Sequence, residues 1–245
     1  MGYSFDSRVR YSETGEDGKL TLPALLDYFQ DCCTFQTDSI RQGIRELRAR
    51  NRFWVLSSWQ VIILRYPEQG ERIITTTFPY KLQGFTGLRN FSMESGSGER
   101  LAVANSQFAL LSTETGLPVR MTEEDLRGYV LDEKLDMDYA QRKIDVPEQM
   151  EKKEPFVIQA HHLDANHHVN NCQYVRMALD YAPKGMRFGS MRAEYKKQGR
   201  LGDVFVPETG RDKDRYVVNL ADPDGRPYAV VELAGILENG RNQAE

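Results

Sequence analysis

The chain has 245 residues, of which 40% are hydrophobic and 28% are charged, so it can bury a core and keep a solvated surface. That length predicts one large domain or two compact ones. The longest run of strongly apolar residues spans only 61–64, which excludes a membrane-spanning helix. A net charge of −4 disfavours a dedicated nucleic-acid-binding protein, whose binding face is basic.

Two further observations indicate a cellular compartment. The first ten residues contain no apolar signal core. The three cysteines are odd in number and two of them, Cys32 and Cys33, are adjacent, a pattern that suits a reducing environment. We therefore expect a cytoplasmic protein.

The first half of the chain predicts one strand, a long helix and four more strands. Alternation favours a strand at 3–11, and Thr21 with Pro23 is typical of a helix start. Apolar residues at three- and four-residue steps then continue toward Leu47. Further strands are expected at about 53–66, 72–82, 87–95 and 100–113.

The same order of elements returns in the second half. Residues 115–153 are rich in acidic side chains and contain Gly116, Pro118 and Pro147, which favours a linker. After it we expect a strand at about 155–162, a helix at 169–181 and strands at 187–198, 202–210, 214–221 and 227–238. A short motif also repeats, because YPEQG at 66–70 and YKKQG at 195–199 are offset by 129 residues.

These elements predict an α+β fold with two similar units. In each, a long central helix would be wrapped by an antiparallel sheet, which is the hotdog arrangement. We expect an N-terminal hotdog at 1–114, a linker at 115–153 and a C-terminal hotdog at 154–245.

All four histidines fall within 161–168, between the first strand and the helix of the second half. Asp164, Asn166 and His168 are spaced two apart and lead into a helix start at Val169 and Asn170. Amide N–H groups at that terminus would stabilise an oxyanion, and a nearby imidazole can take a proton from water. This set predicts hydrolysis of an activated acyl group without a covalent serine.

The spacing D-x-N-x-H-V-N-N-x-x-Y at 164–174 resembles the active-site signature of plant and bacterial acyl-acyl-carrier-protein (acyl-ACP) thioesterases. The EYKK stretch at 194–197, followed by Arg200 and Asp203, is similar to the family's next motif. The resemblance spans about 3–238. It implies that the second unit holds the catalytic residues Asp164, Asn166 and His168, and that the first shapes the acyl-chain pocket.

The implied reaction converts fatty acyl-ACP to free fatty acid and ACP, with ACP as the partner and no cofactor. Because ACP is acidic, basic side chains in two stretches are candidate docking residues. They are Arg41, Arg45, Arg48, Lys196, Lys197 and Arg200. A homodimer is left open.

One pair of residues departs from the family pattern. Plant members have Glu-Cys where this chain has Gln198 and Gly199. An amide cannot act as a base, so Gln198 either holds a water in the site or belongs to a structural turn. The first half has no matching histidine: when Leu22 is aligned with Val169, Thr21 stands opposite His168, which predicts one active site per chain.

Alternative interpretations remain for the same residues. Asp164 and Asn166 could only close turns, and His161, His162 and His167 are expected to be structural or at the surface. The clustered ligand-type side chains could bind a metal ion, but no distant motif completes a shell, so we expect none. An acyl-CoA thioesterase or a non-catalytic acyl-binding protein are the alternative functions.

Overall fold

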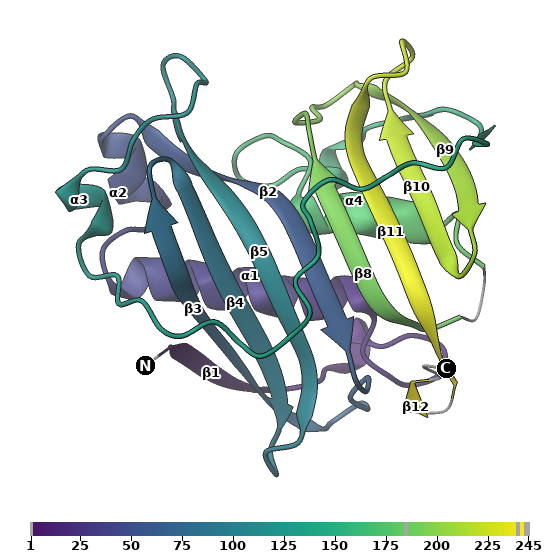
Figure 1. The fold of residues 1–245 in the computed structure, drawn as a ribbon, viewed down its shortest axis with the longest axis horizontal. Coiled ribbons are helices and arrows are strands. Elements are labelled where there is room, and N and C mark those ends of the chain that lie inside the picture. Colours follow the sequence, from purple (N-terminus) through teal and green to yellow (C-terminus); the bar gives the residue numbers. More distant parts are fainter. Residues whose placement is uncertain (1, 184–185, 239–240, 243–245) are drawn as a thin grey trace. The chain divides into compact units, whose positions relative to one another are not determined.

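The computed structural model describes residues 2–183, 186–238 and 241–242, and the chain forms two compact units (Figure 1). The N-terminal unit consists of Met1–Ser57 and Tyr66–Tyr139, and the C-terminal unit of Ser58–Arg65 and Ala140–Glu245. The division therefore falls within one long strand and inside the segment that we expected to be a linker.

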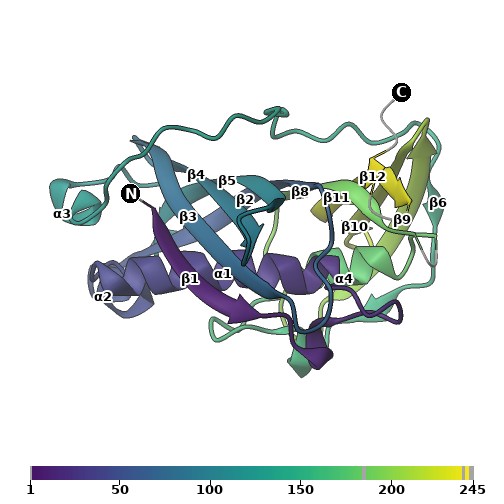
Figure 2. The same cartoon turned by 90° about the horizontal axis from the view of Figure 1, so that it is seen from below.

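The N-terminal unit contains an antiparallel sheet in the order β1-β3-β4-β5. These strands are β1 (Tyr3–Arg8), β3 (Arg72–Gln83), β4 (Thr86–Ser95) and β5 (Arg100–Ser112). Helix α1 (Leu22–Ser39) lies along one face of this sheet and packs on β1 and β3 (Figure 2). Its buried face includes Phe29, whose ring lies 5.3 Å from that of Phe91 on β4.

The start of α1 is as predicted, but its end is not. Thr21 is the N-cap, and its hydroxyl accepts a hydrogen bond from the N–H of Ala24 at 3.3 Å. The helix ends at Ser39 instead of continuing toward Leu47, because Arg41 takes a left-handed conformation with φ of 57°. Apolar spacing continues through this break into a separate helix, α2 (Ile44–Ala49).

The C-terminal unit contains an antiparallel sheet in the order β8-β11-β10-β9. Its strands are β8 (Phe188–Tyr195), β9 (Val204–Asp212), β10 (Arg215–Ala221) and β11 (Pro227–Glu238). Part of β2 (Arg52–Ile63) pairs with β8, from Ser58 to Ile62. The short strands are β6 (Glu151–Lys152) and β7 (Phe156–Val157), both paired with β9, and β12 (Arg241–Asn242), paired with β11.

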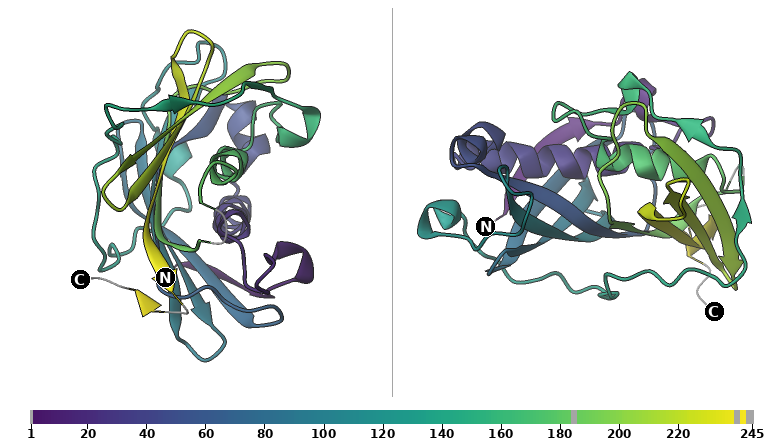
Figure 3. Two further views of the ribbon diagram at one scale, coloured as in Figure 1. Left: turned by 90° about the vertical axis from the view of Figure 1, so that its right-hand side faces the viewer. Right: turned by 90° about the horizontal axis from the view of Figure 1, so that it is seen from above.

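Helix α4 (Asn171–Leu179) packs on β10 and β11 (Figure 3). It has 9 residues against 18 in α1, so the second helix is half as long as the first. The strand expected at 155–162 is wrong: only β7 forms there, and a 3-10 helix, η2 (Ala160–His162), follows. The α+β class is confirmed in both units.

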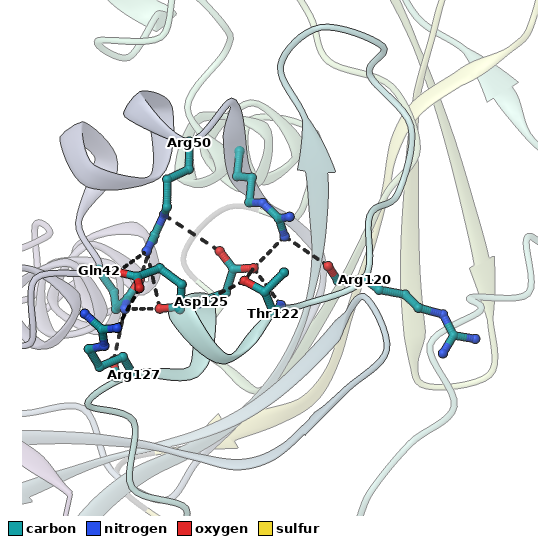
Figure 4. A network of polar contacts seen from close by, with 8 residues as sticks. Gln42, Arg50, Arg120, Thr122, Asp125 and Arg127 are labelled. Atoms are coloured by element: carbon teal, nitrogen blue, oxygen red, sulfur yellow. Dashed lines mark hydrogen bonds and ion pairs between the residues drawn. The ribbon is translucent and has the colours of Figure 1, made fainter.

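Part of the expected linker is fixed to the N-terminal unit by a buried ion pair (Figure 4). Asp125, in the short helix α3 (Glu123–Leu126), is 2% exposed and lies 2.5 Å from Arg52 Nη1. Gln42 donates through Nε2 to the carbonyls of Glu124 at 2.7 Å and Arg127 at 3.0 Å. These bonds hold the segment around α3 against the residues that precede α2.

Across the parts of the chain that the structure describes, no helix combines the length and the apolar character needed to cross a bilayer.

Candidate active site

The predicted catalytic residues lie on a short loop that is closed by its own backbone. Leu163 and Val169 form an antiparallel bridge across its base. The N–H of Asp164 donates to the carbonyl of His168 at 2.8 Å, and the N–H of His167 donates to the carbonyl of Asp164 at 3.0 Å. His167 has a left-handed φ of 59°, which turns the chain back on itself.

The carboxylate of Asp164 accepts hydrogen bonds from other residues of this loop and so stabilises its conformation. Its Oδ1 accepts the backbone N–H groups of Asn166 at 2.8 Å and His168 at 3.3 Å, and its Oδ2 accepts Nδ2 of Asn166 at 3.3 Å. The structure thus brings Asp164, Asn166 and His168 together, with Asp164 bonded to the backbone of His168 and not to its ring. Among the described residues, none forms a hydrogen bond with that ring.

The His168 imidazole is half-buried, and its surroundings favour the neutral form. Burial lowers its pKa below the ordinary value of 6.5, and the charge of Arg200 lowers it further. The carboxylate of Asp164 acts in the opposite direction. A neutral, half-buried imidazole with no hydrogen-bond partner for its ring in the described part of the chain can accept a proton from a water molecule at neutral pH.

The two amides predicted to bind the oxyanion already have acceptors. The N–H of Val169 donates to the carbonyl of Gly199 at 2.9 Å, and the N–H of Asn170 donates to the carbonyl of His162 at 3.0 Å. Asn170 is the N-cap of α4, and its Oδ1 accepts the N–H of Cys172 at 2.8 Å. The first amide at this terminus without a partner among the described residues is that of Asn171.

Gly199 anchors the loop from the neighbouring segment. Its carbonyl accepts the N–H of Val169, and its own N–H donates to the hydroxyl of Tyr174 at 2.7 Å. A Cβ added at Gly199 would lie 2.8 Å from Phe205 Cζ and 2.9 Å from Val169 Cγ2. This site therefore has no room for the cysteine of the plant pattern, whereas Gln198 just before it is exposed.

Tyr174 is a residue whose role the sequence did not reveal. It is part of the motif at 164–174, and its spacing was the only signal. Its hydroxyl accepts from Gly199, and its ring stacks on Phe205 with centroids 5.8 Å apart. Burial raises the pKa of this phenol, so it stays protonated.

The remaining histidines have other positions. His162 accepts the N–H of Gln159 through Nδ1 at 3.0 Å, and its ring lies 4.1 Å from that of His161. His161 and His167 are exposed. Within the described ranges, no group of three or more His, Cys, Asp or Glu side chains could hold a metal ion.

The candidate docking residues belong to both units. Arg41, Arg45 and Arg48 are exposed on or beside α2 in the N-terminal unit. In the C-terminal unit, Lys196 pairs with Glu194 at 3.1 Å, Lys197 pairs with Asp222 at 3.3 Å, and Arg200 is exposed.

Comparison with known protein families shows the family to which the chain belongs. The family model for the acyl-ACP thioesterase N-terminal domain matches residues 2–129, and that for the C-terminal domain matches residues 146–216. The chain belongs to the acyl-ACP thioesterase family. The predicted recognition is therefore confirmed over most of the chain.

Named relatives and solved structures agree with this assignment. An acyl-[acyl-carrier-protein] hydrolase of Cuphea viscosissima is 24% identical over 90% of this chain, and a dodecanoyl-[acyl-carrier-protein] hydrolase of Cinnamomum camphora is 24% identical over 80%. These matches cover 55% and 56% of the relatives, so the chain spans about half their length.

Two solved structures show the fold. An acyl-ACP thioesterase from Bacteroides thetaiotaomicron has a TM-score of 0.84 and 20% identity, covering 94% of this chain and 96% of that one. A 12:0-ACP thioesterase from Umbellularia californica has a TM-score of 0.80 and 19% identity, covering 95% and 96%. The predicted tandem hotdog fold is confirmed.

Proposed function

We propose that the protein hydrolyses fatty acyl-ACP thioesters to free fatty acid and ACP. One observation carries the proposal most: the half-buried imidazole of His168 has no hydrogen-bond partner among the described residues, its pKa is lowered, and Asp164 fixes the loop that presents it. Membership of the acyl-ACP thioesterase family supports the substrate class.

In this mechanism His168 removes a proton from water as the oxygen attacks the thioester carbonyl carbon. A tetrahedral oxyanion forms, the carbon–sulfur bond then breaks, and the proton passes to the departing thiolate. Asn166 orients the water or the carbonyl through its side-chain amide. The N–H of Asn171 at the start of α4 replaces Val169 and Asn170 as the backbone donor proposed for the oxyanion.

The roles of the supporting residues follow from their bonds. Asp164 orders the loop through the backbone of Asn166 and His168 and raises the basicity of the imidazole. Gln198, exposed beside Gly199, is assigned a supporting role in holding water and no role as a base. The proposal keeps one active site per chain, in the C-terminal unit.

The substrate is tested by measuring thiol release from matched acyl-ACP and acyl-CoA thioesters over a panel of chain lengths, with H168A as the blank. We expect turnover of acyl-ACP with a higher kcat/KM than for the matched acyl-CoA. Faster hydrolysis of acyl-CoA would assign the related acyl-CoA activity instead. Binding of both without any thiol release would show a non-catalytic acyl-binding protein.

Docking of the acidic carrier is tested at α2. Arg41 and Arg45 are suitable positions because the lysines at 196 and 197 are already paired with Glu194 and Asp222. R41E and R45E should raise KM for acyl-ACP, because they remove long-range attraction to an acidic protein. The effect should be largest at low salt, because salt screens that attraction. KM for acyl-CoA, which has no carrier protein to dock, should stay unchanged. An equal rise for both substrates would contradict the docking role.

A further inference from the structure

Residues 196–203 connect β8 to β9 and support the loop that carries His168; we call them the anchor segment. The carbonyl of Gly199 accepts the N–H of Val169 at 2.9 Å. Burial lowers the pKa of the His168 imidazole, and the charge of Arg200 lowers it further. Any group that fixes the anchor segment therefore also fixes the surroundings of His168.

The side chain of Lys197 joins the anchor segment to the end of β10 and to β11. Its Nζ lies 3.3 Å from Oδ2 of Asp222 and 4.3 Å from the centroid of the Tyr228 ring. Tyr228 and Asp222 raise the pKa of this ammonium group above its ordinary value of 10.5, so it stays charged at neutral pH. The lysine side chain is 49% exposed, but that of Asp222 is only 6% exposed. The cation is thus held between a buried carboxylate and the face of a buried ring.

The carboxylate that receives Lys197 is itself fixed. Asp222 Oδ1 accepts the backbone N–H groups of Asp224 at 3.1 Å and Arg226 at 2.9 Å. Its Oδ2 also accepts Nε of Arg226 at 3.2 Å. These bonds lie within the turn between β10 and β11, whereas the ion pair with Lys197 ties that turn to the anchor segment.

The backbone of Lys197 transmits this constraint toward the loop. Its N–H donates to the carbonyl of Tyr228 at 3.2 Å, and its carbonyl accepts the hydroxyl of Tyr174 at 3.4 Å. The same hydroxyl accepts the N–H of Gly199 at 2.7 Å. Because one phenol binds both Lys197 and Gly199, a displaced lysine would also displace the carbonyl that receives Val169.

We propose that Lys197 is a positioning residue for His168, in place of the docking role expected from its charge. Its ammonium group, held by Asp222 and Tyr228, fixes the anchor segment beneath the loop, and it acts on the reaction only through that segment. The effect on turnover rests on the proposed function. The effect on the surroundings of His168 rests on the contacts alone.

The titration of His168 reports on this role independently of turnover. The charged or titratable groups that act on its ring are Arg200, Asp164 and His167, and of these only Arg200 belongs to the anchor segment. A loosened anchor segment should weaken the influence of Arg200 and raise the pKa of His168 toward 6.5.

K197M tests the proposal in the full chain, because it removes the charge and keeps an apolar side chain. We expect kcat for acyl-ACP to fall roughly 3- to 30-fold with KM little changed, and the pKa of His168, measured by NMR, to rise. K197R should restore most of kcat, since a guanidinium can also bind Asp222 and stack on Tyr228. The matched control is R226M, which removes the other cation on Asp222 and should keep the kcat and the His168 pKa of wild type.

D222N removes the same ion pair from the other side and should reproduce both changes, which keeps the test valid if K197M does not fold. A docking role for Lys197 predicts the opposite pattern in K197M, a higher KM with unchanged kcat and unchanged His168 pKa, and would overturn the proposal. Equal effects of K197M and R226M would also overturn it, because they would show a general effect of lost charge.

Failure of this proposal is distinguishable from failure of the proposed function. If wild type releases no thiol from acyl-ACP, the hydrolysis is refuted, but the NMR titration needs no substrate. An unchanged His168 pKa in K197M and D222N would then still refute the positioning role.

Discussion

Two loops of the molecule have the same backbone hydrogen-bonding pattern but different side chains. In the N-terminal unit, Thr14 and Leu20 form the bridge that Leu163 and Val169 form in the C-terminal unit. The N–H of Gly15 donates to the carbonyl of Lys19 at 2.9 Å, as that of Asp164 does to His168 at 2.8 Å. Each loop follows a 3-10 helix and ends at the N-cap of the main helix of its unit.

This matching places Lys19 opposite His168, Gly15 opposite Asp164 and Asp17 opposite Asn166. The alignment of Leu22 with Val169, expected from the sequence, is therefore wrong by two residues. Its conclusion about the base still holds, because no imidazole stands in the N-terminal loop. The loop architecture is thus structural in both units, and the side chains of one copy add the chemistry.

The largest expected effect is a difference in kcat between substitutions at two adjacent histidines of the C-terminal loop. H168A should lower kcat by at least about 100-fold, because general-base catalysis contributes about 10²–10⁴-fold. The matched control is H167G, because His167 is exposed and has the left-handed backbone that Gly18 has in the other loop, with φ of 71°.

H167G should keep kcat within a few-fold of wild type and should not lower the melting temperature. Circular dichroism on both variants shows whether they fold. Equal losses of kcat in two folded variants would contradict the assignment of the base to His168.

A smaller effect is expected at the segment that anchors each loop. G199A should cost about 1–3 kcal/mol of unfolding free energy, since its Cβ would overlap Phe205 and Val169. It should also lower kcat, because Val169 donates to the Gly199 carbonyl. The carbonyl of Pro67 accepts the N–H of Leu20 in the same way in the N-terminal loop. P67A should therefore lower kcat less than G199A does for the same loss of unfolding free energy.

Denaturant unfolding and thiol release measure both quantities for the two variants. A G199A protein of wild-type stability and activity would show that the close packing around Gly199 does not hold the loop.

The smallest expected effects are shifts in pH dependence. The charge of Arg200 lowers the pKa of His168, so R200Q should raise that pKa and move the acidic limb of kcat/KM to higher pH. The carboxylate of Asp164 raises it, so D164N should move the limb to lower pH. Opposite shifts at low ionic strength are the expected result, and shifts in one direction would contradict the electrostatic account.

Local signals predicted more of this molecule than signals that depend on distant contacts. Thr21 and Pro23 marked the start of α1 because an N-cap acts within one turn. The histidine loop was found for the same reason, since Asp164 accepts hydrogen bonds from both Asn166 and His168 within four residues of chain. Hydrogen bonds between residues far apart in the chain could not be predicted from the sequence. The bond from the N–H of Val169 to the carbonyl of Gly199 is one of these, because it depends on tertiary structure.

The repeated YPEQG and YKKQG motifs show the same limit. The sequence paired Gly70 with Gly199, but the structure gives Gly70 the role of Gly202. The N–H of Gly70 donates to Val9, and that of Gly202 donates to Ile158, each in a left-handed conformation. The connections 64–71 and 196–203 have the same length, but YPEQG begins three residues after β2 ends whereas YKKQG begins at the last residue of β8, which sequence identity alone did not reveal.

The most direct test of a general base in the C-terminal loop is to titrate the His168 imidazole by NMR and to record the pH profile of kcat/KM in the same buffer. Activity requires the unprotonated ring, so it should fall as the pH drops through the pKa of His168. The account predicts that both curves share one midpoint, below the ordinary histidine value of 6.5. An acidic limb that does not follow the His168 titration, or that persists in H168A, would contradict it.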